Sequence, residues 1–127
     1  MKIGFLAVIA AFVSTAALAD CPAKSPSVKG QVTFDAADKR VNTAWLTKNL
    51  AGRRVKFEDG TEHYEDDGSY YYTSGSGRWD APDYKFYSNG LRCIGYPTPR
   101  FDIYVVNNGK LVLINHAGRR FVGKVLK

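Results

Sequence analysis

The sequence contains few of the residues that carry most enzyme and metal chemistry. It has two histidines, two cysteines and one methionine among 127 residues. Neither cysteine has a second cysteine or a histidine at the spacing of a zinc site, so we expect no metal. It contains no Gly-x-Ser-x-Gly element, phosphate-binding loop or His-Glu-x-x-His pair, which argues against the enzymes built on those motifs. We therefore expect no catalytic residues and no cofactor, in a protein that is not an enzyme.

Long apolar runs and blocks of like charge are also scarce. The main apolar run, Ile3 to Val13, is shorter than the roughly 20 residues that span a bilayer. The formal net charge is +6, but the basic residues are scattered and form no nucleic-acid-binding arm. We expect no nucleic-acid partner and no stable membrane anchor in the mature form.

Residues 1–19 have the pattern of a secretory signal peptide. Lys2 precedes the apolar run, and Ala17-Leu18-Ala19 supplies the small-x-small pattern of a cleavage site. Asp20, directly before Cys21, disfavours lipid attachment, which requires a small residue there. We predict cleavage after Ala19 and a periplasmic or secreted protein.

The two cysteines, Cys21 and Cys93, would then lie in an oxidising compartment. We predict that they form a disulfide, which closes a loop of about seventy residues and contributes roughly 4 kcal/mol in the chain-entropy model. The alternatives are two unpaired thiols or pairing of Cys21 between molecules.

The remaining chain is predicted to be an extended lead-in, residues 20–34, followed by a single helix-plus-β-barrel domain, residues 35–127. Pro22 and Pro26 block a helix in the lead-in. Asp35 is a suitable N-cap for an amphipathic helix of about sixteen residues, which Gly52 ends.

After Gly52 the sequence reads as antiparallel strands joined by tight turns. Asp-Gly and Asn-Gly dipeptides, which tolerate positive φ in hairpins, separate alternating runs; they lie at 59–60, 67–68, 89–90 and 108–109. The fold class is therefore mainly β, an antiparallel up-and-down meander or small barrel, closed or nearly closed, of about seven or eight strands with one N-terminal amphipathic helix. The strands near 101–114 are apolar on both faces, so we expect the helix to cover one face and the barrel interior to take up the other.

The order "DDGSYYY", "GSGRW", "RCIGYPTPRFDIYVVNNGKLVLI" and "AGRRF" resembles small periplasmic β-barrel proteins of Gram-negative, chiefly α-proteobacterial, bacteria. The resemblance covers about residues 45–125 and implies location and fold, because these families have no established common activity. Gly77-x-Trp79 is also similar to the Gly-x-Trp of lipocalins and avidins. It lies mid-chain rather than on the first strand, so no lipocalin function is transferred.

Tyrosines supply the candidate binding residues. In the triplet Tyr70-Tyr71-Tyr72, strand geometry places the outer two rings on one face and Tyr71 on the other, and Trp79 is predicted to lie in the core. An exposed aromatic stripe with two flanking arginines is the candidate surface for a ligand or partner. Its members would be Tyr71, Tyr87, Arg92, Tyr96, Arg100 and Tyr104. The proline-containing loop between the arginines is the favoured recognition element.

An acidic stretch at 58–67, with His63 among its carboxylates, is interpreted as a solvated hairpin; a cation site is the alternative.

Three functional hypotheses follow. The first is an exported non-catalytic binding module of the cell envelope, which binds an envelope protein or a glycan; one version of it is an enzyme inhibitor. The second is a carrier of a small apolar ligand, which requires an internal cavity of a few hundred Å³ lined by aromatics. The third, a hydrolase using His63, is disfavoured because it requires a nucleophile or metal beside that residue.

Overall fold

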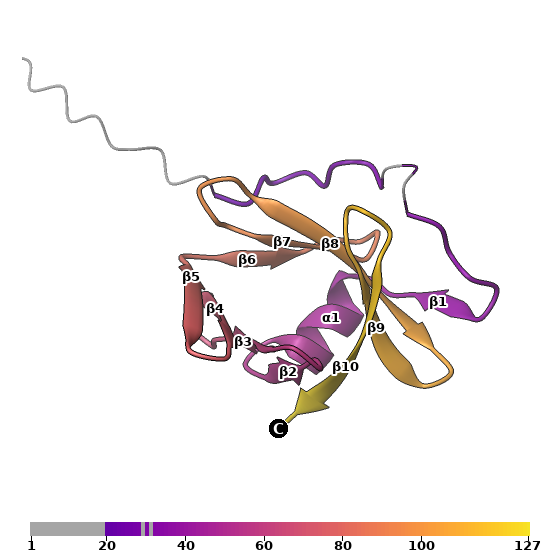
Figure 1. Ribbon diagram of the computed structural model, residues 1–127. Coiled ribbons are helices and arrows are strands. Elements are labelled where there is room, and N and C mark those ends of the chain that lie inside the picture. Colours follow the sequence, from indigo (N-terminus) through magenta and orange to yellow (C-terminus); the bar gives the residue numbers. More distant parts are fainter. Residues whose placement is uncertain (1–19, 29, 31) are drawn as a thin grey trace, which may run out of the picture.

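The computed structural model describes residues 20–28, 30 and 32–127 (Figure 1). The predicted signal peptide, residues 1–19, lies outside these residues. The described chain forms ten strands and one helix, and every strand pair is antiparallel. The elements are β1 (Asp38–Arg40), α1 (Thr43–Leu50), β2 (Arg54–Lys56), β3 (Thr61–Tyr64), β4 (Tyr70–Ser74), β5 (Gly77–Ala81), β6 (Tyr84–Phe86), β7 (Leu91–Ile94), β8 (Arg100–Asn107), β9 (Lys110–Ile114) and β10 (Arg120–Leu126). The mainly β, antiparallel prediction is confirmed.

The strands form one sheet that curls into a half-barrel. Its order is β5-β4-β3-β2-β10-β9-β8-β7-β6, and β1 pairs with β8 beside this path. The last strand, β10, pairs with β2 near the start of the domain, with Val125 opposite Val55. The sheet is open between β5 and β6, which follow each other in the chain. The predicted number of seven or eight strands was too low, because long-range pairings such as that of β1 with β8 carry no local sequence signal, and the barrel expected to be closed or nearly closed is a half-barrel.

The helix is much shorter than predicted. It comprises 8 residues, and Asn42 is its N-cap, accepting a hydrogen bond from the Trp45 amide at 3.0 Å. The segment expected to begin the helix instead contains β1, where Asp38 pairs in register with Asn107. The Asp38 carboxylate also accepts hydrogen bonds from the Asn107 amide and the Arg120 guanidinium. These tertiary bonds outweigh the local preference for a cap at Asp35.

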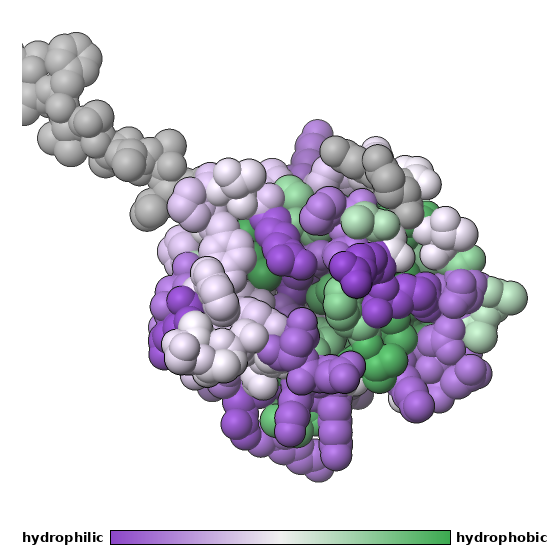
Figure 2. Space-filling model, in the orientation of Figure 1, coloured by the Kyte–Doolittle hydropathy of each residue, from purple (hydrophilic) through white to green (hydrophobic). Residues whose placement is uncertain are grey.

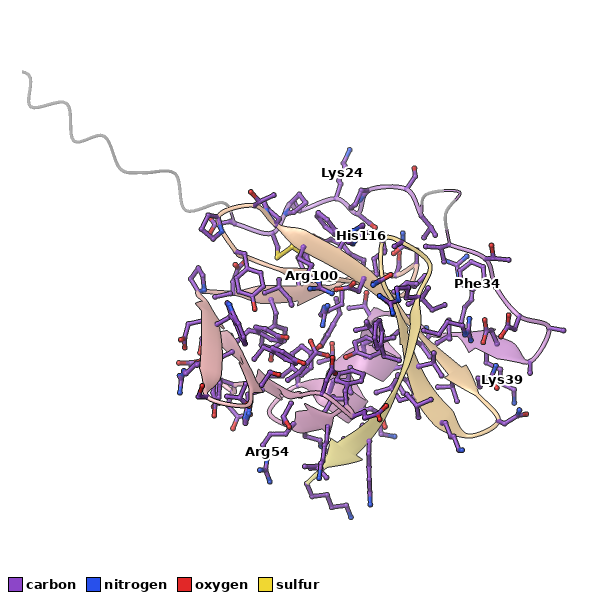
Figure 3. All side chains as sticks on the ribbon, in the orientation of Figure 1. Lys24, Phe34, Lys39, Arg54, Arg100 and His116 are labelled. Atoms are coloured by element: carbon purple, nitrogen blue, oxygen red, sulfur yellow. A yellow bond between two sulfur atoms is a disulfide. The ribbon has the colours of Figure 1, made fainter. Side chains whose placement is uncertain are left out.

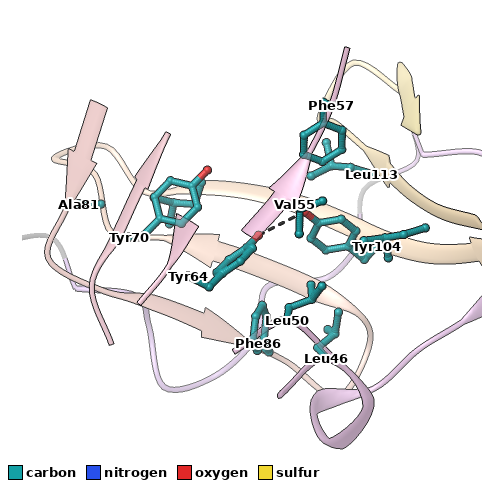
Figure 4. Close-up of a cluster of buried hydrophobic side chains, with 12 residues drawn as sticks. Leu46, Leu50, Val55, Phe57, Tyr64, Tyr70, Ala81, Phe86, Tyr104 and Leu113 are labelled. Atoms are coloured by element: carbon teal, nitrogen blue, oxygen red, sulfur yellow. Dashed lines mark hydrogen bonds between the residues drawn. The ribbon is translucent and has the colours of Figure 1, made fainter. Parts of the chain in front are cut away.

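The interior of the half-barrel contains an apolar cluster to which α1 contributes two leucines. Leu46 and Leu50 are fully buried and belong to the same cluster as Phe86, Phe57 and Leu113. Figure 4 shows the two leucines and Phe86 at one side of this cluster, and Phe57 and Leu113 at the other. The helix therefore closes one end of the interior. No helix in the described part of the chain is long and apolar enough to cross a bilayer.

The outer face of β7, β8 and β9 is covered by the lead-in and not by the helix. Val28, Val32 and Phe34 pack against a second buried cluster that includes Ile103 and Val112. Figure 1 shows the indigo and purple segment running past β7 and β8. The expectation that α1 covers this face was wrong, because α1 packs inside the curl.

A disulfide fastens the lead-in to the sheet, as predicted. Cys21 and Cys93 are bonded, with their Cα atoms 5.9 Å apart. The Tyr87 hydroxyl donates to the Pro22 carbonyl at 2.6 Å, and the Asn89 amide donates to Ser25 Oγ at 2.8 Å. The lead-in thus completes the outer layer of the core.

Candidate functional site

A buried ionic cluster lies inside the half-barrel. Glu62 on β3, Arg92 on β7 and Asp102 on β8 are 3%, 1% and 2% exposed. Arg92 and Asp102 are cross-strand partners in the antiparallel register. Because side chains alternate across a strand, these three positions face inward together with Tyr64 and Tyr104, two residues along their own strands.

The Glu62 carboxylate is the centre of the hydrogen-bond network. One oxygen accepts from the hydroxyls of Tyr64, at 3.0 Å, and Tyr104. The other accepts from the Tyr70 hydroxyl, at 2.6 Å, and from Arg92. Four donors therefore occupy the acceptor capacity of this carboxylate.

The Arg92 guanidinium connects the two carboxylates. It donates to Glu62, to the Tyr64 hydroxyl at 3.0 Å, and to Asp102. Burial lowers the pKa of Arg92, but the carboxylates of Glu62 and Asp102 outweigh burial and hold that pKa well above its ordinary value. Burial raises the pKa of the Tyr64 and Tyr104 phenols, because it disfavours the charged phenolate, and the negative charge of Glu62 raises the pKa further. These phenols therefore remain protonated donors at neutral pH.

A cavity of about 460 Å³ adjoins this cluster. Aromatic and aliphatic side chains form most of its walls, and Glu62 and Arg92 reach it from the ionic cluster. Its lining residues are Phe57, Asp59, Glu62, Tyr70, Tyr72, Trp79, Arg92, Ile94, Tyr96, Arg100, Leu113 and Phe121. None belongs to α1, so the cavity occupies the part of the interior that the helix does not fill. Figure 2 shows green hydrophobic residues recessed between purple hydrophilic ones on the face drawn.

Two partly exposed side chains border the cavity. The Trp79 side chain on β5 is 50% exposed, and its ring lies 5.9 Å from that of Tyr72 in a tilted pair. The Arg100 side chain is also 50% exposed, and its Nε donates to Asp102 at 2.9 Å. Figure 3 shows Arg100 inside the curl of the sheet, whereas Arg54 points away from it. A ligand can therefore meet one aromatic and one cationic group before it reaches the ionic cluster.

The structure brings together three of the predicted binding residues. Arg92, Tyr96 and Arg100 line the same cavity. Tyr104 is fully buried and contributes its hydroxyl to the ionic cluster without lining the cavity.

The other two predicted residues lie on the outer face of the sheet. Tyr87 is buried beneath the lead-in. The ring of Tyr71 stacks on that of His63, with the ring centroids 3.9 Å apart, and the Arg78 guanidinium lies 3.9 Å from the centroid of the Tyr71 ring. The six residues therefore form no exposed stripe, because they are divided between the two faces of the sheet and three of them, Tyr87, Arg92 and Tyr104, are buried.

The sequence did not predict most residues of the site, among them Glu62, Tyr70, Tyr72, Trp79 and Asp102. Glu62 was assigned to a solvated hairpin, but it is buried, and its position two residues before Tyr64 was the available signal for an inward face. The division of the tyrosine triplet is confirmed, yet it is the pair Tyr70 and Tyr72 that borders the cavity. Trp79, expected in the core, is half-exposed because it lies on an edge strand.

His63 lies on β3 with its side chain away from the cavity. Its ring is within 3.3 Å of Thr73 Oγ1 and stacks on Tyr71. Burial lowers the pKa of His63, and the Arg54 charge lowers it further, so the ring is neutral at neutral pH. Within residues 20–28, 30 and 32–127, no three His, Cys, Asp or Glu side chains gather as metal ligands do.

Comparison with known proteins adds no relative to this description. No family model, no curated protein and no solved structure matches this chain.

Proposed function

We propose that this protein is an exported, non-catalytic binding module that holds a small, largely apolar molecule in the cavity of its half-barrel. The observation that carries the proposal is the cavity of about 460 Å³, with aromatic walls and an ionic cluster beside it. Ligand sites in proteins have volumes of roughly 300–1,000 Å³, apolar linings and a few placed polar groups. The cavity has each of these features.

The orientation of the 95–99 loop supports a small ligand over a protein partner. Tyr96 and Arg100, at the two ends of the loop, line the cavity. The loop that was favoured as a recognition element therefore borders an internal site. Tyr87 and Tyr104, which a flat protein interface would need at the surface, are 4% and 0% exposed.

Export remains part of the proposal. The signal-like residues 1–19 and the Cys21–Cys93 disulfide both fit an oxidising compartment outside the cytoplasm. A periplasmic or secreted carrier of an apolar molecule is consistent with these features.

Binding can be tested with N-phenyl-1-naphthylamine, a neutral aromatic fluorophore. A Trp45→Phe background leaves Trp79 as the only tryptophan of the chain, so quenching of its emission reports occupancy of the cavity. We expect saturable binding in this background. Measured by probe fluorescence, Trp79→Ala should weaken binding about tenfold, since stacking on one aromatic contributes about 1–3 kcal/mol.

The matched control is Val122→Ala on β10. Val122 is 59% exposed and does not line the cavity, so this change should leave binding unaltered. Absence of saturable binding, or equal affinity of the Trp79→Ala and Val122→Ala variants, would contradict the proposal.

A further inference from the structure

We infer that the cavity selects an electrically neutral aromatic molecule that carries a hydrogen-bond acceptor at the end nearest Arg92. This inference rests on the proposed function, since it names the chemical class of ligand for the same site. Charge balance, hydrogen-bond capacity and the composition of the walls each support it.

The charges at the inner end of the cavity already cancel. Arg92 pairs with Glu62 and Asp102, and Asp102 also pairs with Arg100. Two guanidinium groups therefore face two carboxylates. A ligand carrying a charged group to this depth would leave one charge without a buried counterion, which is costly in a poorly solvated site. Neutral ligands avoid this cost.

At the inner end of the cavity, one hydrogen-bond donor has no partner among the described residues. All four acceptor positions of the Glu62 carboxylate are used by Arg92 and three tyrosine hydroxyls. Arg92 Nε is a buried donor that has no hydrogen-bond partner among the described residues, and Arg92 is itself a lining residue. A buried donor without an acceptor is destabilising. The complementary group on a ligand is therefore an acceptor, such as a carbonyl or ether oxygen.

The walls beyond the inner end favour a flat ring system. Five aromatic side chains line the cavity beside Tyr70: Phe57, Tyr72, Trp79, Tyr96 and Phe121. Aromatic side chains pack on other rings in stacked or edge-to-face arrangements that add to simple burial of area. Asp59, the remaining lining carboxylate, is exposed to solvent. Its negative charge repels an anionic ligand, and solvent screens its attraction for a cationic one.

Four naphthalene derivatives that differ only in their substituent test this inference by isothermal titration calorimetry. They are 2-acetylnaphthalene, 2-isopropenylnaphthalene, 2-naphthoate and 2-naphthylmethylammonium. The first two have nearly the same shape, and only the ketone has an acceptor. We expect the ketone to bind about tenfold more tightly than the hydrocarbon, because a hydrogen bond from a charged donor is stronger than one between neutral groups. Both ions should bind more weakly than the ketone.

The Arg92→Lys variant provides a second measurement. Lysine retains the positive charge but removes Nε–H, so the preference for the ketone over the hydrocarbon should fall towards unity. The comparison on the unaltered protein tests the inference even if this variant does not fold. Tighter or equal binding of the hydrocarbon or of either ion overturns the inference and leaves the proposed function standing. Failure of all four compounds to bind overturns the proposed function as well.

Discussion

Replacing Glu62 by glutamine should strongly destabilise the protein, although the two side chains have nearly the same shape. The carboxylate is buried and accepts hydrogen bonds from Arg92, Tyr64, Tyr70 and Tyr104. Glutamine removes the negative charge and turns one acceptor into a donor that faces other donors. Removing one partner of a buried ion pair costs about 3–5 kcal/mol. Since Asp102 still pairs with Arg92, we expect about 3 kcal/mol.

This loss should be measured by urea unfolding followed by circular dichroism. The matched control is Glu58→Gln, a substitution in the same acidic stretch at a solvent-exposed position, where a change of about 0.5 kcal/mol or less is expected. In thermal unfolding, Glu62→Gln should lower the Tm by roughly 12–24 °C, from the 4–8 °C per kcal/mol typical of a domain of this size. If both substitutions change the unfolding free energy by the same small amount, Glu62 is not part of a buried network.

A double-mutant cycle separates the ion pair from other effects of the change. Arg92→Met should cost about as much as Glu62→Gln, because it leaves the Glu62 carboxylate buried without a cation, whereas Asp102 still pairs with Arg100. The double variant should cost less than the sum of the two by about 1 kcal/mol or more, since groups in one network are coupled. Strictly additive losses would refute the pairing.

Three other predictions concern the framework around the site. Hydrogen bonding to Arg120 lowers the pKa of Asp38 from 3.8 to about 2, so this carboxylate contributes about 2 kcal/mol to the free energy of unfolding above pH 4, and the contribution is lost as the pH falls through 2. In acid-unfolding curves Asp38→Asn should remove this pH dependence. An unchanged curve would argue against the pair of Asp38 and Arg120. The combined Cys21→Ala and Cys93→Ala substitutions open a loop with a sequence separation of 72 and should cost about 4 kcal/mol in guanidinium unfolding; a loss below about 1 kcal/mol would mean that the disulfide does not hold the lead-in. A Cβ at Gly123 would lie 2.7 Å from a Val55 methyl group, so Gly123→Ala should lower the free energy of unfolding in urea by about 1 kcal/mol or more. An unchanged free energy of unfolding would contradict this close packing.

Short-range patterns in the sequence determined much of the β structure. The turn at Asn108-Gly109 has positive φ at both residues, 48° and 77°, as the Asn-Gly pair predicts for a type I′ hairpin. Period-two alternation placed Tyr71 opposite Tyr70 and Tyr72, and the structure has that division. The two cysteines of the chain also predicted their own pairing once an oxidising compartment was assumed, and the structure has that disulfide.

Only the tertiary structure decided which inward face became the site. Glu62 and Glu58 lie in the same acidic stretch, but one is buried and the other exposed, because pairing of β10 with β2 curls the sheet and brings β3 opposite β7 and β8. The same closure places Arg92 between carboxylates that are 30 and 10 residues away in sequence. Local propensity carries no information on contacts at such separations. The cavity and its ionic cluster therefore result from long-range strand pairing, whereas the strands themselves are determined by alternation and turn residues.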